Sequence, residues 1–257
     1  KETKLEGTEL SPGQLRVGAL KDGLQPFVDR PEAMPELPVL PGILSGLTVI
    51  RTQYESRDDA KLINLFHNTN HPALAKPDQI ILTWSGDPQT TQTIQWRTGT
   101  GVAKGQVQWV KKSAYNRFQP ARPKRAKAGT FKMEDANLLN DPVVHRHTAT
   151  LTGLEPDTTY LYSVGDGSDD GWSEMAEFTT APGRTEPFSF VYMGDAQNGL
   201  YRWGSLVQDA FRQRPDAAFY IMAGDLVNRG NERDDWDSLF HNARGIYDRR
   251  PVVPAIG

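Results

Sequence analysis

Two similar phrases near the end of the chain constrain its fold more than any other feature. Each is a run of apolar, β-branched and aromatic residues that ends in Gly-Asp: FSFVYMGDAQ at 188–197 and FYIMAGDLVNRG at 219–230. Such a run is typical of a buried parallel strand, and the glycine lets the chain turn sharply so that the aspartate lies at the strand's carboxyl end. Because sites in open α/β sheets form at that edge, Asp195 and Asp225 are candidate metal ligands.

The stretch between the two phrases predicts how the strands are connected. Apolar residues at helical spacing indicate an amphipathic helix near 201–213, so that strand, helix and strand fit one right-handed βαβ unit. We expect three neighbouring parallel strands with a second helix near 232–244; the strands are 188–193, 218–223 and 251–256. The carboxylates of Asp195 and Asp225 are then expected at one edge of the sheet.

A different pattern precedes these strands. From Asp78 to Thr179 the chain has short segments that alternate apolar and polar residues and are separated by turn residues. This pattern predicts an antiparallel β-sandwich over 77–181, with Trp84 and Trp96 contributing apolar surface to its core or to a domain interface.

Several of these segments resemble a known family. The stretches DQIILTWSGD at 78–87, IQWRT at 94–98 and HTATLTGLEPDTTYLYSVGDG at 147–167 resemble the fibronectin-III-like domain of purple acid phosphatases. The two Gly-Asp phrases resemble the first two blocks of the calcineurin-like metallophosphoesterases, the second in the form Gly-Asp-x-x-Asn-x-Gly.

The resemblance implies a mixed fold in three parts. Residues 1–76 are an extended N-terminal arm or connector, 77–181 a fibronectin-III-like β-sandwich, and 187–257 the N-terminal portion of an α/β metallophosphoesterase domain of the α/β/β/α type. The function implied is hydrolysis of a phosphate mono- or diester by two metal ions (Fe, Mn or Zn). A periplasmic or extracellular location is the family's expectation.

The resemblance also assigns site residues. Asp225 bridges the two metals and Asp195 binds the first. Gln197 stands where many relatives have His, and is either a weak metal ligand or a hydrogen-bonding group behind the ligands. Asn228 orients a ligand or water, and Arg229 either binds the substrate phosphate or forms a surface salt bridge.

Three departures bear on activity. Gln197 replaces His, and Asn228 stands where purple acid phosphatases have the Tyr that gives them their colour. The family's third block, Gly-Asn-His, stops here at Gly257. We therefore expect the catalytic His to lie beyond Gly257, and expect the remainder of the catalytic domain to accompany an active form. The alternative is an inactive binding or scaffold protein.

Composition excludes other classes of function. The net charge of −3 comes from interspersed acids and bases, so we expect no nucleic-acid partner. No segment has the ~20 apolar residues of a membrane helix, and the chain has no cysteine. A basic insertion over 117–132 is interpreted as a solvated hairpin rather than a phosphate-binding patch. Asp166, Ser168 and Asp170 have calcium-loop spacing but lie between two predicted strands, which favours a turn.

Overall fold

The computed structural model describes residues 66–116, 118, 121–230 and 232–255, and the backbone of two short strands, β1 (Arg16–Val17) and β2 (Phe27–Val28). β1 and β2 pair antiparallel. The predicted connector spans residues 1–76. Apart from β1 and β2, its residues 1–65 lie outside the described part of the chain. The chain divides into two compact units: 1–68 with 137–139, and 69–136 with 140–257.

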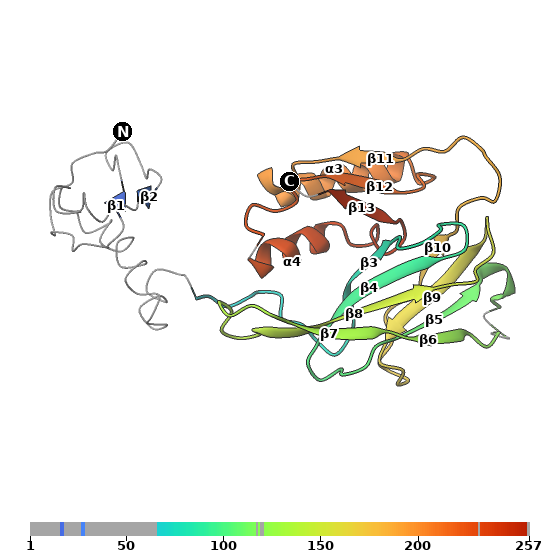
Figure 1. Cartoon of the computed structure of the whole chain (residues 1–257), viewed down its shortest axis with the longest axis horizontal. Coiled ribbons are helices and arrows are strands. Elements are labelled where there is room, and N and C mark those ends of the chain that lie inside the picture. Colours follow the sequence, from blue (N-terminus) through green and yellow to red (C-terminus); the bar gives the residue numbers. More distant parts are fainter. Residues whose placement is uncertain are drawn as a thin grey trace. The chain divides into compact units, whose positions relative to one another are not determined.

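The second unit begins with two four-stranded antiparallel sheets (Figure 1). One sheet has the order β3-β4-β8-β7, with bounds Asp78–Thr83, Gln92–Gly99, Val143–Leu151 and Gly129–Glu134. The other has the order β10-β9-β5-β6, with bounds Ala176–Thr179, Thr159–Gly165, Gln106–Lys111 and Lys124–Lys127. A short 3-10 helix, η3 (Lys112–Ala114), follows β5. These two sheets are the predicted sandwich.

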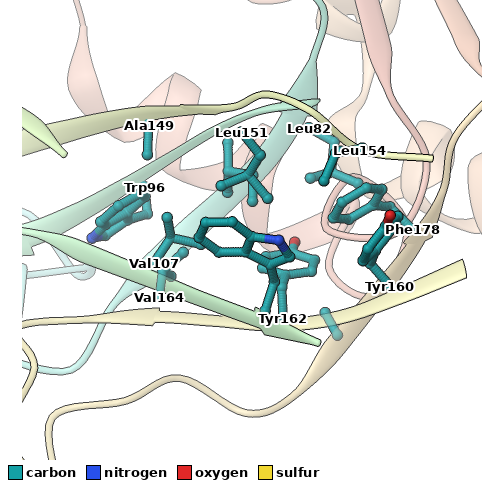
Figure 2. Close-up of a cluster of buried hydrophobic side chains, with 13 residues drawn as sticks. Leu82, Trp96, Val107, Ala149, Leu151, Leu154, Tyr160, Tyr162, Val164 and Phe178 are labelled. Atoms are coloured by element: carbon teal, nitrogen blue, oxygen red, sulfur yellow. The ribbon is translucent and has the colours of Figure 1, made fainter. Parts of the chain in front are cut away.

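The core of the sandwich lies between the inward faces of the two sheets. Alternating positions of both sheets point inward, and the largest buried side chains there include Trp96, Tyr162 and Phe178, all 2% exposed or less (Figure 2). Trp84 is half-buried and packs edge-on against Phe219, with ring centroids 5.3 Å apart. The prediction that Trp84 and Trp96 serve a core or an interface is therefore confirmed.

Three parallel strands follow the sandwich, in the order β11-β12-β13. Their bounds are Val191–Met193, Tyr220–Ala223 and Val252–Ala255. A 3-10 helix, η4 (Ala196–Asn198), and helix α3 (Leu200–Gln213) connect the first two strands, and α4 (Arg233–Asn242) connects the last two. The βαβ prediction is confirmed, although β11 begins three residues later than expected.

The parallel sheet is packed on the sandwich within the same unit. The Leu82 backbone N–H donates to the Tyr247 carbonyl (2.8 Å), and the Thr83 hydroxyl donates to the Val252 carbonyl (3.0 Å). The Tyr162 hydroxyl donates to the Asp248 carbonyl (2.6 Å). These bonds fix β13 and the turn before it against β3 and β9.

A buried histidine in the sandwich makes its stability depend on pH. His147 is fully buried, stacks on Trp96, and has a threonine hydroxyl at each ring nitrogen: Thr98 at Nε2 (2.7 Å) and Thr130 at Nδ1 (2.8 Å). Burial, with smaller contributions from the nearby His145 and Arg146 charges, lowers the pKa of His147 to about 4. The neutral ring is therefore the form that the fold holds.

We predict a loss of stability on mild acidification. The unfolded chain protonates this imidazole near pH 6.5 and the folded chain only near pH 4, so the free energy of unfolding falls between these values by about 3 kcal/mol. Urea unfolding at stepwise pH measures the slope, which should flatten in His147→Gln and persist in the exposed His241→Gln. An unchanged slope in His147→Gln would contradict the assignment.

Candidate metal site

The two candidate aspartates occupy equivalent positions on neighbouring parallel strands. Asp195 follows β11 and Asp225 follows β12, each after a glycine. Both residues have left-handed backbone, with φ of 51° at Asp195 and 50° at Asp225. A positive φ is uncommon outside glycine, and its occurrence at both places indicates that the turns are shaped to present these side chains. Both aspartates are exposed at the carboxyl edge of the sheet.

Hydrogen bonds join the two turns. The Gln197 backbone N–H donates to the Asp225 carbonyl (3.2 Å), and its side-chain N–H donates to Asp225 Oδ2 (3.1 Å). The Asn228 side-chain N–H in turn donates to the Gln197 carbonyl (2.9 Å). The structure therefore brings Asp225, Gln197 and Asn228 together, with Asp195 two residues before Gln197.

The two ends of the Gln197 amide play different parts. Its nitrogen holds the Asp225 carboxylate, which is the supporting role that the sequence left open. Its oxygen, Oε1, is buried and has no hydrogen-bond partner in the described part of the chain. An unpartnered buried oxygen near the Asp225 carboxylate suits a cation, because such an atom otherwise loses its bonds to water.

Arg229 forms the surface salt bridge that the sequence gave as its other role. Its Nη2 lies 2.8 Å from Asp235 Oδ1, and both its Nε and its backbone N–H donate to Asp235 Oδ2. The nearby Asp235 carboxylate raises the pKa of Arg229. The next residue, Gly230, accepts from the Trp236 indole N–H (2.9 Å), so the first turn of α4 holds the loop after Asp225 at two points.

A mostly apolar cavity of about 550 Å³ adjoins this loop. Asp225 is the one acidic residue that lines it among the described residues. Most of its other walls are hydrophobic and come from the loop after Asp225, from α4 and from β13; they include Leu226, Val227, Trp236, Phe240 and Pro254. The carboxylate therefore lies between solvent and an apolar recess.

The types of donor at this edge suit a hard or borderline ion, but the donors are few. Two carboxylates and an amide oxygen are ligand types that hard or borderline ions accept. The described ranges contain no group of three or more His, Cys, Asp or Glu side chains placed to hold a metal. A site with three or more such ligands, for a first ion as well as for a second, would therefore need residues from outside these ranges.

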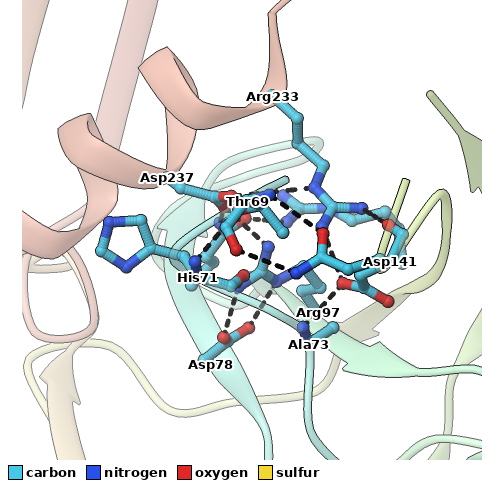
Figure 3. A network of polar contacts seen from close by, with 11 residues as sticks. Thr69, His71, Ala73, Asp78, Arg97, Asp141, Arg233 and Asp237 are labelled. Atoms are coloured by element: carbon cyan, nitrogen blue, oxygen red, sulfur yellow. Dashed lines mark hydrogen bonds and ion pairs between the residues drawn. The ribbon is translucent and has the colours of Figure 1, made fainter. Parts of the chain in front are cut away.

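Sequence reasoning missed a buried ion cluster that links α4 to the sandwich (Figure 3). We call Asp78, Arg97, Asp141, Arg233 and Asp237 the ion cluster. Arg97 binds Asp78 and Asp237 at 2.6 Å each, and Arg233 binds Asp141 at 2.7 Å. Burial raises the pKa of Asp237, opposed by the charges of Arg97 and Arg233. In the sequence, the i, i+4 spacing of Arg233 and Asp237 on the predicted helix was the feature that could have indicated such a pair.

Comparison with known proteins shows which domain family the sandwich resembles. Residues 77–180 match the family model for the purple acid phosphatase N-terminal domain. Over these residues the chain is similar to the N-terminal domain of purple acid phosphatases. It is 24% identical over 193 residues to "Probable inactive purple acid phosphatase 1" of Arabidopsis thaliana, a match that covers 64% of this chain and 30% of the relative.

The solved structure of one purple acid phosphatase supports the same fold. The purple acid phosphatase PPD1 from yellow lupin seeds is 21% identical, with a TM-score of 0.58, and the match covers 71% of this chain and 35% of that one. PhoD matches at 14% identity and a TM-score of 0.47, over 73% of this chain and 40% of its own. The chain spans about a third of the length of the Arabidopsis relative and of PPD1. None of its described helices is long and apolar enough to cross a bilayer.

Proposed function

We propose that this chain supplies the Asp195–Asp225 half of a metal-dependent phosphoesterase site, in a protein that hydrolyses phosphate mono- or diesters. Residues 187–257 would then be the N-terminal portion of the catalytic domain, after a fibronectin-III-like sandwich at 77–181 and a connector at 1–76. A periplasmic or extracellular location is part of the same proposal. The observation that carries it is the pair of left-handed aspartates on neighbouring parallel strands.

Each residue has a role in this proposal. Asp195 and Asp225 would hold the first metal ion, with Asp225 extending to a second. Gln197 orients Asp225 through its N–H and offers Oε1 to the cation, while Asn228 fixes the Gln197 backbone. When bound, two such ions (Fe, Mn or Zn) polarise a phosphoryl group and lower the pKa of a shared water. Arg229, whose side chain is 60% exposed, would have to break its two side-chain hydrogen bonds to Asp235 to reach a substrate phosphate.

A second candidate is an inactive phosphoesterase-like protein that binds or scaffolds. It is favoured by the hydrogen bond from Gln197 to Asp225, which occupies one carboxylate oxygen without a metal. A relative described as a probable inactive purple acid phosphatase points the same way. The two candidates differ in whether the aspartates bind metal at all.

Binding of Mn²⁺ to the full chain separates them. We expect one weakly held Mn²⁺ per chain, detected by electron paramagnetic resonance and calorimetry, because two carboxylates without imidazoles form a sparse ligand set. Asp195→Asn and Asp225→Asn are each expected to weaken binding about tenfold or more. The matched control is Asp209→Asn on α3, an exposed aspartate paired with Arg212, which should leave the affinity unchanged.

The outcomes of these measurements separate the metal-site proposal from the scaffold alternative. Absence of binding, or equal binding by Asp225→Asn and the parent chain, would overturn the metal-site proposal and favour the scaffold. With p-nitrophenyl phosphate we expect little turnover by this chain alone, since the second metal position lacks ligands in the described residues. Robust turnover that Asp225→Asn abolishes would show that no further ligands are required.

A further inference from the structure

One region of the chain carries positive charge without any acid. Between Asp87 and Glu134 the sequence contains no Asp or Glu and ten Lys or Arg residues, in a protein with a net charge of −3. These ten are about a third of the 29 basic residues in the whole chain. The excess of positive charge is therefore confined to this region and is not a feature of the whole chain.

Four of these ten cations are already neutralised in the fold. Arg97 belongs to the ion cluster, and three surface lysines, Lys111, Lys112 and Lys132, pair with Glu155, Glu177 and Glu134. The other described cations of the region are exposed and form no ion pair within the described ranges; they are Lys104, Arg122, Lys124, Arg125 and Lys127. Four of these five lie on β6 or within two residues of it.

β6 is an edge strand of the sandwich (Figure 1). In the order β10-β9-β5-β6 it pairs with β5 on one side, and no described strand pairs with its other side. Its outer N–H and C=O groups are therefore free to pair with an added strand. Ala126 packs against the core of the sandwich, so Arg125 and Lys127 lie on the opposite, outward face.

Arg125 is held in place. Its guanidinium lies over the Trp172 ring, 5.3 Å from the ring centroid. A cation stacked on an indole has lost much of its freedom already, so an incoming carboxylate has less to order. Two residues along, Lys127 repeats the charge on the same face, at a spacing of about 6.6–6.8 Å for an extended strand.

We propose that β6 is a docking edge for an extended acidic peptide segment. The segment adds beside β6 as a fifth strand through backbone hydrogen bonds, and acidic residues at every second position meet Arg125 and Lys127. Backbone pairing gives affinity in this recognition mode, and alternate side chains give specificity. The acid-free run supplies the charge complementarity, and the free edge supplies the backbone groups. This proposal is independent of any metal at Asp225.

The binding test uses the full chain and a fluorescein-labelled decapeptide of alternating Glu and Thr, followed by fluorescence anisotropy at low salt. We expect saturable binding that the double substitution Arg125→Glu/Lys127→Glu weakens about tenfold or more. The matched control is Lys111→Glu/Lys112→Glu, which makes the same change in net charge at lysines that are already paired, and should weaken binding much less. Circular dichroism and thermal unfolding confirm that both double variants are folded.

Two further probes test the strand addition itself. A decapeptide of the same Glu-Thr sequence with a methyl group on every backbone nitrogen keeps the charge and cannot donate backbone hydrogen bonds, so its binding should be lost. A single-stranded DNA oligonucleotide of equal charge should bind more weakly than the Glu-Thr peptide. Equal binding of the N-methylated peptide or the oligonucleotide would overturn the proposal, as would an equal loss in the two double variants. Absence of peptide binding would also overturn the proposal. The exposed lysines of β6 would then serve to keep this edge from aggregating.

Discussion

Replacing Asp237 by alanine is expected to lower the free energy of unfolding by about 3–5 kcal/mol, because it leaves two buried arginines with one carboxylate partner each and part of their charge uncompensated. The Asp237 side chain is 1% exposed, and those of Arg97 and Arg233 are 3% and 4% exposed. Asp237 Oδ1 accepts from Arg97 Nη1 at 2.6 Å, and its Oδ2 lies 3.7 Å from Arg233 Nε. Removing the carboxylate leaves Arg97 with Asp78 and Arg233 with Asp141 as their remaining partners.

Chemical denaturation of the two chains measures this loss directly. The matched control is Asp209→Ala, which removes an exposed aspartate from α3 together with its salt bridge to Arg212. Exposed pairs contribute about 0–1 kcal/mol, so the control should remain within that range. A loss of the same size in both variants would mean that the ion cluster does not hold α4 on the sandwich.

The ion cluster illustrates what the sequence could not predict. Arg97 lies 140 positions from Asp237, and nothing local in β4 distinguishes it from an ordinary polar residue in an alternating strand. Its burial becomes intelligible only when α4 is packed against the sandwich. Pairings of this kind depend on tertiary contacts, which hydrophobic periodicity does not encode.

The elements themselves were predictable because their periodicity is strong. The alternating segments of the sandwich and the two apolar runs before Gly-Asp each match a single secondary structure. The boundary of β11 was less predictable, since Phe188 and Phe190 continue the apolar pattern although the strand begins at Val191. These two rings instead pack near Phe219, outside the strand ladder.

The candidate site was predictable in part for the same reason. The position of Asp195 and Asp225 at one sheet edge follows from two parallel strands that end in Gly-Asp. The hydrogen bond from Gln197 to Asp225 does not, because it joins two turns separated by a helix. The pairing of Arg229 with Asp235 requires the exact start of α4, and helix boundaries are the least certain part of a sequence interpretation.

The second large effect is expected at Trp96. Its side chain is fully buried in the sandwich core and stacks on His147, with ring centroids 5.3 Å apart. Trp96→Ala removes the whole indole from a packed interior, so we expect a loss of about 3–5 kcal/mol in the free energy of unfolding. Urea denaturation followed by circular dichroism measures it.

The Trp96→Ala experiment needs a control at an exposed ring and a separate probe of the parallel sheet. Phe131→Ala on β7 removes an aromatic ring that is 55% exposed, and should change stability by about 0.5 kcal/mol or less. The hydrogen bonds from Leu82 to Tyr247 and from Thr83 to Val252 tie the parallel sheet to the sandwich. In Trp96→Ala, the sheet should therefore lose its structure in the same transition as the sandwich, with the ¹⁹F NMR signal of Trp203 on α3, in 5-fluorotryptophan-labelled protein, as the probe of the sheet. Unchanged stability in Trp96→Ala would refute the core assignment, and separate transitions would show that the two parts fold independently.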